Sequence, residues 1–273
     1  MKKWFIGILA FILTIVAAYY QRTTGPTYPK SVQLKISENI INFEFPHSHD
    51  TSGDCPIIIP LNNNSFSAKL FYRFYPTNMP FRIIPFIRKG DSLIAKLPVQ
   101  PPAGKLLYYI TISNNDKEIY SNESDPQIVR FKGSISPYIL IPHILLMFSV
   151  MFLSVWVLLR ILTGMSFKPY LYATVIFLFL GGMVFGPIVQ KLAFGEFWTG
   201  IPFGWDLTDN KTLIAFTFWL IALFTNIKKK ENKIWVIVAP IITLVIFLIP
   251  HSLFGSQLNY QTGEIVQGFI LMF

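Results

Sequence analysis

Four long apolar runs lie between Tyr138 and Ile249, separated by short polar breaks. Each run approaches the ~20 residues that an α-helix needs to cross a hydrocarbon core of about 30 Å. The chain is also 52% hydrophobic and only 14% charged, which leaves too few charges for the surface of an ordinary soluble protein. The sequence therefore predicts a transmembrane α-helical domain over residues 138–250, in contact with a lipid bilayer.

An earlier apolar run, Trp4 to Tyr20, follows two lysines at the start of the chain. We predict a transmembrane anchor over residues 1–20. The alternative is the core of a secretory signal peptide, because the small residues at positions 16–18 are suited to cleavage. The predicted spans of the later domain are Tyr138–Leu162, Tyr170–Val189, Thr212–Asn226 and Ile234–Ile249.

The lysines predict the orientation of these spans. Lys168 lies between the second and third spans, and four lysines lie between residues 228 and 233. Because short loops rich in lysine and arginine stay in the cytoplasm, this pattern predicts a multi-pass protein of a bacterial inner membrane. Residues 21–137, the loop 190–211 and the tail 251–273 would then share the outer, periplasmic side. The net charge is +9, but cations such as Lys2, Lys3 and Lys228–Lys230 lie close to predicted spans, where lipid and topology explain them, so we expect no nucleic-acid partner.

Between residues 28 and 132 the helical period gives way to short alternating runs rich in aromatic and β-branched residues. These runs are Val32–Ile36, Ile40–Phe45, Pro56–Leu61, Phe66–Tyr75, Ile83–Ile87, Ser92–Leu97, Leu106–Ser113 and Gln127–Phe131. Turn-forming residues rich in Asn, Gly, Pro and Asp separate them. The number and spacing of the strands predict an exported, immunoglobulin-like β-sandwich. The predicted fold class is thus an α+β membrane protein with an anchor helix, this all-β domain and four transmembrane helices.

The run Phe66–Tyr75 predicts two different faces of one strand. Ala68, Leu70, Tyr72 and Phe74 would point one way, and Lys69, Phe71, Arg73 and Tyr75 the other. The second face mixes cations with aromatic rings. It is either an ordinary solvated face or a surface for a protein partner.

His47, His49 and Cys55 lie within nine residues of one another, beside Asp50 and Asp54. Imidazole, thiolate and carboxylate are all metal ligands, so copper or zinc capture is one hypothesis. The cluster lacks the paired spacing of established zinc motifs, and Thr51-Ser52-Gly53 is typical of a turn. A polar loop between two strands is the alternative. Cys55 is the single cysteine, which excludes an internal disulfide.

Two histidines follow prolines at predicted outer ends of different spans: His143 after Pro142, and His251 after Pro250. Two imidazoles at one depth could ligate a haem iron or copper, or bind a quinone headgroup. The alternative is that each histidine donates to backbone carbonyls freed by the neighbouring proline.

The outer loop 190–211 is rich in aromatic residues and glycine. Asp209 or Thr208 is the predicted N-cap of the following span. Trp205, Glu196 and Asp206 would shape a cofactor site if this loop covered His143 and His251. The alternative is an aromatic belt at headgroup depth. A lipid- or glycan-modifying enzyme with Glu196 and Asp206 as acid and base is a further reading.

Gly182 and Gly186 in the third span have the spacing that lets helices approach closely. The middles of the four spans contain no Lys, Arg, Asp or Glu. Because pumps and proton-coupled carriers need such residues at depth, this absence argues against transport.

Several segments together resemble a family of uncharacterised bacterial inner-membrane proteins: Lys132-Gly133, Ile141-Pro142-His143, Phe185-Gly186-Pro187, residues 203–212 and Ile249-Pro250-His251-Ser252. The resemblance implies an exported β-sandwich on a four-helix membrane part and no particular activity. The outer Trp205-Asp206 pair is also similar to the Trp-Asp haem-handling loop of cytochrome c assembly proteins. That similarity is limited to the two residues, without the neighbouring Trp-x-Trp-Asp arrangement.

The sequence contains no nucleotide cradle, nucleophile elbow or His-Glu-x-x-His pair. The leading expectation is therefore a non-catalytic accessory or assembly subunit that binds membrane or periplasmic proteins of an envelope complex. The alternative is a redox or cofactor-handling protein that binds haem, copper or a quinone.

Overall fold

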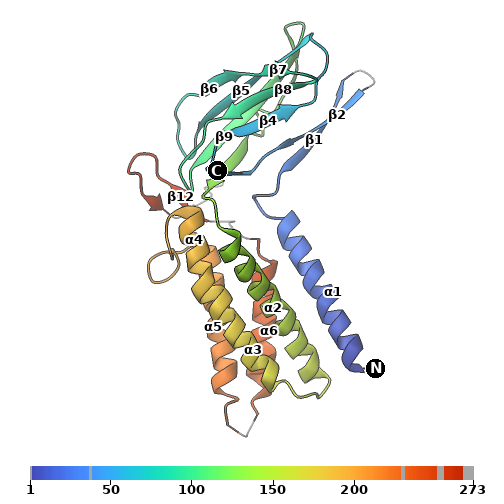
Figure 1. Ribbon diagram of the computed structural model, residues 1–273, viewed down its shortest axis with the longest axis vertical. Coiled ribbons are helices and arrows are strands. Elements are labelled where there is room, and N and C mark those ends of the chain that lie inside the picture. The colour runs from blue at the N-terminus through green and yellow to red at the C-terminus, as the bar shows by residue number, and fades with distance from the viewer. Residues whose placement is uncertain (1, 37–38, 229–230, 251–254, 267–273) are drawn as a thin grey trace.

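The structure is a computed structural model, which describes residues 2–36, 39–228, 231–250 and 255–266. It has mixed α+β architecture, with several β-sheets and four long apolar helices. The β domain lies at one end of a bundle of helices (Figure 1). The start of α1 and the turns that join α2 to α3 and α5 to α6 lie at the opposite end.

The helices of the structure lie where the apolar runs of the sequence predicted them. They are α1 (Lys2–Thr23), α2 (Pro137–Leu162), α3 (Lys168–Leu178), α4 (Gly186–Phe194), α5 (Leu207–Phe224) and α6 (Lys233–Leu248). A π-helical segment, η1 (Phe179–Phe185), joins α3 to α4, so residues 168–194 form one continuous helix. Within the described residues, four helices are long and apolar enough to span a membrane: α1, α2, the α3–η1–α4 helix and α5.

Helix α6 has 16 residues and falls short of that length. At 1.5 Å per residue it is about 24 Å long, less than a hydrocarbon core of about 30 Å. Its inner face is nevertheless part of the helical core. Trp219 of α5 is fully buried, and its indole Nε1 donates to Thr243 Oγ1 of α6 at 2.8 Å.

Helix α1 packs along α2, although it is the most exposed helix of the bundle. A Cβ at Gly7 would lie 2.6 Å from the Trp156 ring, so the absence of a side chain at residue 7 permits this contact. Ala10 is fully buried on the same side. The choice between an anchor and a signal peptide stays a prediction.

The π-helical segment packs closely against two other helices, α2 and α5. A Cβ at Gly181 would lie 2.8 Å from Leu146 Cβ, and a Cβ at Gly182 would lie 2.6 Å from Thr212 Cγ2. The predicted close approach at Gly182 is confirmed. At Gly186 it is wrong, because the nearest atom of another helix is His143 Cε1 at 4.0 Å. The widened π turn moves the contact from Gly186 to Gly181.

Two sheets build the main body of the β domain. The larger has the order β3-β11-β9-β5-β6, with β10 paired to β9, and the smaller has the order β4-β8-β7. All pairs in them are antiparallel except β11 with β3. The strands are β3 (Ser48–Asp50), β4 (Cys55–Ile59), β5 (Phe66–Phe74), β6 (Arg82–Pro85), β7 (Ile87–Lys89), β8 (Ser92–Leu97), β9 (Lys105–Asn114), β10 (Lys117–Ser121) and β11 (Gln127–Lys132).

One hydrophobic core lies between these two sheets. Leu70, Ile110 and Phe131 from the larger sheet and Ile57 and Leu97 from the smaller sheet are fully buried in it. The alternation predicted for β5 is confirmed at Ala68, Leu70 and Tyr72, which face this core while Lys69 is exposed. Burial of the alternate side chains is the main force that fixes the register of such a strand.

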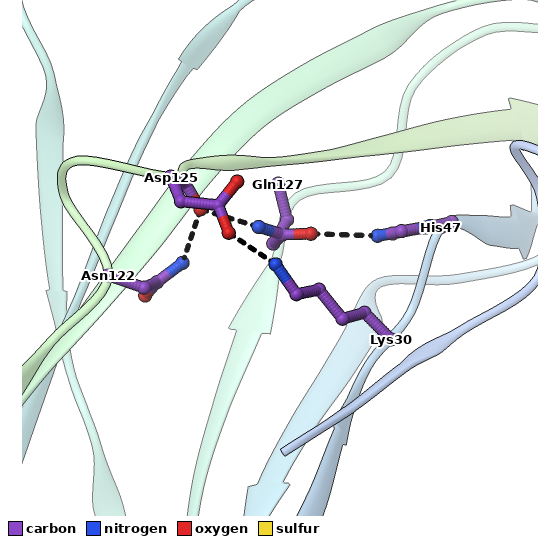
Figure 2. A network of polar contacts seen from close by, with 5 residues as sticks. All are labelled: Lys30, His47, Asn122, Asp125 and Gln127. Atoms are coloured by element: carbon purple, nitrogen blue, oxygen red, sulfur yellow. Dashed lines mark hydrogen bonds and ion pairs between the residues drawn. The ribbon is translucent and has the colours of Figure 1, made fainter.

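A separate hairpin, β1 (Lys30–Ile36) with β2 (Asn39–Phe45), rises from α1 and packs Phe43 and Phe45 into the same core. Polar contacts fasten its base to the loop before β11 (Figure 2). Lys30 pairs with Asp125, and the Asp125 carbonyl accepts hydrogen bonds from Asn122 and Gln127. Because Lys30 and Asp125 are both exposed, this ion pair adds little stability and mainly fixes position.

The chain after α6 returns to the β domain, an arrangement that the sequence did not indicate. Residues 257–266 form a hairpin of β12 (Gln257–Leu258) and β13 (Ile265–Val266). The Leu258 amide donates to the Ala103 carbonyl of the β domain at 3.1 Å. The outer tail predicted over residues 251–273 therefore includes an ordered hairpin; residues 251–254 and 267–273 lie outside the described part.

Candidate functional site

The loop between α4 and α5, residues 195–206, is compact and lies at the β-domain end of the helices. We call this loop the knuckle. Helix α4 is followed by the C-cap residue Gly195, whose φ of 97° is readily adopted by glycine. The amides of Phe203 and Gly204 both donate to the Gly200 carbonyl at 2.9 Å. The knuckle exposes 81% of Phe203 and 67% of Trp205. The aromatic belt at headgroup depth stays a prediction for these exposed rings.

Asp206 closes the knuckle and begins α5. Its Oδ1 accepts from the amides of Thr208 at 2.8 Å and Asp209 at 3.4 Å, which makes it the N-cap. The cap predicted at Asp209 or Thr208 is wrong, because α5 begins before the apolar run at Thr212. The other oxygen, Oδ2, accepts from the amide and hydroxyl of Ser256 at 3.1 and 3.2 Å. Asp206 is only 2% exposed, so these protein contacts take the place of the hydrogen bonds that water would make to an exposed carboxylate.

Arg130 of β11 reaches the same point from the β domain. Its Nη2 donates to the Ser256 carbonyl at 2.5 Å, and its guanidinium carbon lies 3.6 Å from the centre of the Phe194 ring. Burial lowers the pKa of Arg130 to about 10, while the negative charge of Asp206 opposes that shift. Arg130 therefore remains charged at neutral pH. We call Arg130, Phe194, Asp206 and Ser256 the junction.

The backbone next to the junction leaves no room for a side chain at Gly133. Its amide donates to the Ala193 carbonyl at 2.9 Å, and an added Cβ would collide with the Leu192 carbonyl oxygen. The segment leaving β11 therefore lies directly against the end of α4. This contact and the junction join the β domain to the helices at two adjacent places.

A second carboxylate supports the knuckle from α5. Asp209 is buried, and its Oδ2 accepts from the Thr199 amide at 2.6 Å and from Gln190 Nε2 at 2.9 Å. Lys211, also buried, donates to the carbonyls of Ile249 at 3.0 Å and Pro250 at 3.3 Å, just beyond α6. Both side chains satisfy backbone groups that helix ends and tight loops leave unpaired.

The predicted cofactor residues occupy different surroundings. His143 is half-buried, and its Nδ1 lies 2.9 Å from the Gly181 carbonyl of the π-helical segment. Glu196 and Trp205 are exposed, while Asp206 belongs to the junction. In the described part of the chain, no hydrogen bond or ion pair connects His143 with any of these three residues. His251 lies outside the described residues, so a site that includes it stays a prediction.

The Gly181 carbonyl can only accept, so Nδ1 of His143 carries the proton in this contact. The contact is structural, but the predicted acceptor is wrong: it is a carbonyl of the π-helical segment and not one freed by Pro142. It leaves Nε2 with the lone pair whenever the ring is neutral.

The predicted metal ligands each have another partner. His47 Nε2 donates to Gln127 Oε1 at 3.0 Å (Figure 2), and the His49 ring packs edge-on against Phe131. Cys55 is fully buried in the core, and burial raises the pKa of its thiol to about 12, which disfavours the thiolate. Across the described ranges, no group of three or more His, Cys, Asp or Glu side chains could hold a metal ion.

Asp50, next to these residues, belongs to the predicted turn. Its Oδ1 accepts from the Ser52 amide at 2.8 Å, and both oxygens accept from Ser134 Oγ at 2.9 Å. The hydrogen bond from Ser134, followed by that from the Ser52 amide, lowers the pKa of Asp50. The segment is thus an ordered turn between β3 and β4.

Sequence reasoning missed Arg130 and Ser256. Arg130 lies on the face of β11 opposite to the core residues Val129 and Phe131, where alternation predicts exposure to solvent. It is buried because the hairpin and the end of α4 cover that face. Ser256 is 126 residues away in the sequence, and no local pattern marks their contact.

The chain is thus a mixed α+β protein whose β domain is joined by a buried polar junction to helices apolar enough to span a membrane. No protein-family model and no curated protein matches the sequence. Membership of the resembled inner-membrane family therefore stays a prediction.

Proposed function

We propose that this protein is a non-catalytic subunit of an envelope membrane complex, which holds its β domain outside a bacterial inner membrane to bind a protein partner. The junction is the observation that carries this proposal. A domain fastened by Arg130, Gly133 and Ser256 is held in one orientation, as a scaffold requires. Both oxygens of Asp206 are already hydrogen-bonded, which favours a structural role over acid–base chemistry.

The arrangement of charges supports the membrane placement. The two lysine-bearing turns meet at the end of the bundle far from the β domain, where Lys168 Nζ donates to the Lys228 carbonyl at 3.2 Å. The knuckle and the described hairpin lie at the other end. In the orientation we propose, both turns are cytoplasmic and the β domain is periplasmic.

An orientation test uses the protein's own turns. Alkaline phosphatase fused after Asn232 should be inactive, whereas the same reporter fused after Gly195 should be active, because it folds only in the periplasm. The reverse pattern would contradict the orientation.

The β domain supports an immunoglobulin-like reading, since its two sheets share one core. We propose its outer β5–β6 region as the partner surface. Phe71 stacks on Tyr109 with ring centres 4.5 Å apart, and the Arg73 guanidinium lies 4.8 Å from the centre of the Phe81 ring. Beside this ordered aromatic array, Ile83 in β6 is 58% exposed. A rigid aromatic surface with an arginine and an apolar edge is typical of interfaces.

Site-specific crosslinking in intact cells tests partner binding. A photoreactive amino acid at Ile83 should crosslink to one specific envelope protein, and the same substitution at Ile40, an exposed position on the β1–β2 hairpin, is the matched control. Equal crosslinking patterns from the two positions would contradict the proposed surface.

A cofactor role is the second candidate, and the contact of His143 favours it. Donation from Nδ1 to a backbone carbonyl is the usual second contact of a histidine whose Nε2 binds a metal. An absorption spectrum and metal analysis of the purified protein decide between the candidates. A Soret band or bound copper that disappears in the His143→Ala, His251→Ala double variant supports the cofactor role; a chromophore that persists shows that the site is wrong.

A further inference from the structure

A pocket of about 850 Å³ lies between the β domain and the C-terminal hairpin, next to the junction but separate from its residues. Residues 75–79, which follow β5, form one side, and residues 257–261 of the hairpin form the other. Its volume falls within the range of about 300–1,000 Å³ that small-molecule sites occupy. The junction fixes the hairpin wall, since Ser256, which precedes Gln257, is bonded to Arg130 and Asp206.

The charge of the pocket favours an anion. Arg73 contributes the charged side chain, and no Asp or Glu occurs among the described residues that line the pocket. The Phe81 ring supports the Arg73 guanidinium at 4.8 Å, while Nε is buried and has no hydrogen-bond partner within the described part of the chain. A planar guanidinium held on a ring is suited to bidentate binding of a phosphate or carboxylate.

The other walls favour a hydroxyl-rich ligand. Two contacts hold Tyr260 in place. Its hydroxyl donates to the Lys105 carbonyl at 3.0 Å, and the centre of its ring lies 4.6 Å from the centre of the Phe74 ring. Asn78 contributes a side-chain amide that can both donate and accept, while Asn259 has only its Nδ2 donor left, because its Oδ1 accepts from the Gln261 amide at 2.9 Å. Flat ring faces beside amides fit a polyol or sugar better than a purely apolar molecule.

Lys105 adds positive charge behind the hairpin wall. Its Nζ donates to Gln257 Oε1 at 3.2 Å and lies 5.9 Å from the centre of the Tyr75 ring. Gln257 and Tyr75 both line the pocket. Burial, followed by the charge of Arg130, lowers the pKa of Lys105 to about 8, so at pH 7 most Lys105 side chains are charged and add to the attraction of Arg73 for an anion.

We propose that this pocket binds the phosphate ester of a polyol or sugar, with the phosphate on Arg73. Two sources share that chemistry: a soluble phosphorylated polyol and the headgroup of an anionic phospholipid. The hairpin β12–β13, which lines the pocket, lies at the β-domain end of the helices (Figure 1), where the membrane surface would be, so the lipid source rests on the membrane placement proposed above. The soluble source does not.

The test uses the full chain in nanodiscs. In nanodiscs of phosphatidylcholine alone, glycerol 3-phosphate is titrated by calorimetry. In a second set that also contains phosphatidylglycerol, co-purifying phosphatidylglycerol is counted by native mass spectrometry after detergent release. Saturable binding in the first arm identifies a soluble ligand, and selective retention in the second identifies a lipid headgroup. Binding in neither arm overturns the proposal.

Matched variants separate the pocket from general attraction to cations. Arg73→Gln should weaken binding about tenfold, whereas Arg82→Gln, at an exposed neighbouring arginine that does not line the pocket, should change it less than twofold. Asn78→Trp, at an exposed loop position, should fill the pocket and abolish binding even if Arg73→Gln fails to fold. Equal losses in the two arginine variants, or full binding in Asn78→Trp, would refute the site. Failure of the reporter test would remove only the lipid source.

Discussion

Asp206 divides its two carboxylate oxygens between two parts of the molecule. Oδ1 holds the start of α5, and Oδ2 holds Ser256 of the returning chain. A buried carboxylate that satisfies several N–H and O–H donors is expensive to replace, because the donors would stay buried without a partner. The residue thus combines a helix cap with a tertiary contact.

Asp206→Ala should lower the free energy of unfolding by about 2–3 kcal/mol, since it removes an N-cap and leaves the Ser256 amide without its acceptor. Chemical denaturation of the detergent-purified protein measures this change. Glu196→Gln, at an exposed acid of the same loop, should stay within about 0.5 kcal/mol of the parent. Equal stabilities of the two variants would contradict the role of Asp206.

Cys55 reports unfolding of the β domain. With a pKa of about 12, about one thiol in ten thousand is ionised at pH 8 in the folded protein, against roughly a quarter in an unfolded chain. Maleimide labelling should therefore be slow until denaturant is added, whereas a cysteine placed at exposed Asn62 in a Cys55→Ser background should react at once.

The raised pKa also gives Cys55 a defined pH dependence. Its contribution to folding stability is complete below the unfolded pKa of about 8.5 and decreases as the pH rises toward about 12. Stability measured from pH 8 to 11 should fall less steeply in Cys55→Ser than in the parent. Identical slopes would show that Cys55 does not titrate as its burial indicates.

At the scale of elements, regular patterns predicted most of the fold. Strand β8 has the predicted bounds, β5 is one residue shorter at its C-terminal end, and β9 is one residue longer at each end. No sequence pattern predicted the π-helical segment, since its residues are as hydrophobic as those of an ordinary α-helical span. The hairpin β12–β13 also had none, because strands of two residues are too short to show alternation and depend on contacts such as that of Leu258 with Ala103.

Gly182 should tolerate a side chain much less well than Gly186. Gly182→Ala places a methyl group 2.6 Å from Thr212 Cγ2, so α5 must move, at a cost of about 1–3 kcal/mol. Gly186→Ala meets only atoms at 3.5 Å or more and should leave stability unchanged or raised. Apparent melting temperatures in detergent compare the two. Equal losses would indicate that helix propensity, rather than packing, governs this segment.

At the scale of the whole molecule, sequence identified one side of the candidate site. The loop containing Asp206 stood out by its aromatic residues and acids, but Arg130 and Ser256 did not, because their contacts join segments far apart in the chain. Their burial follows from how the β domain meets the helices. A single sequence carries no periodic signal for such contacts.

Arg130→Leu should loosen the β domain from the helices without unfolding either part. Loss of the bond to Ser256 and of the contact with Phe194 leaves a junction about 1.4 kcal/mol weaker, so limited proteolysis between residues 132 and 137 should be about tenfold faster. Arg82→Leu, at an exposed arginine of the same domain, is the control. Unchanged cleavage in Arg130→Leu would show that the contact at Gly133 alone holds the domain.

The position of Ser256 in the chain sets an order of assembly. The ribosome makes the β domain and Arg130 before α2 and makes Ser256 only after α6. Because domains generally fold as units during synthesis, the β domain can be complete while Arg130 still awaits its acceptor. The contacts of Gly133 and Arg130 with the end of α4 can form earlier, so the bond to Ser256 completes the junction only after α6 has emerged.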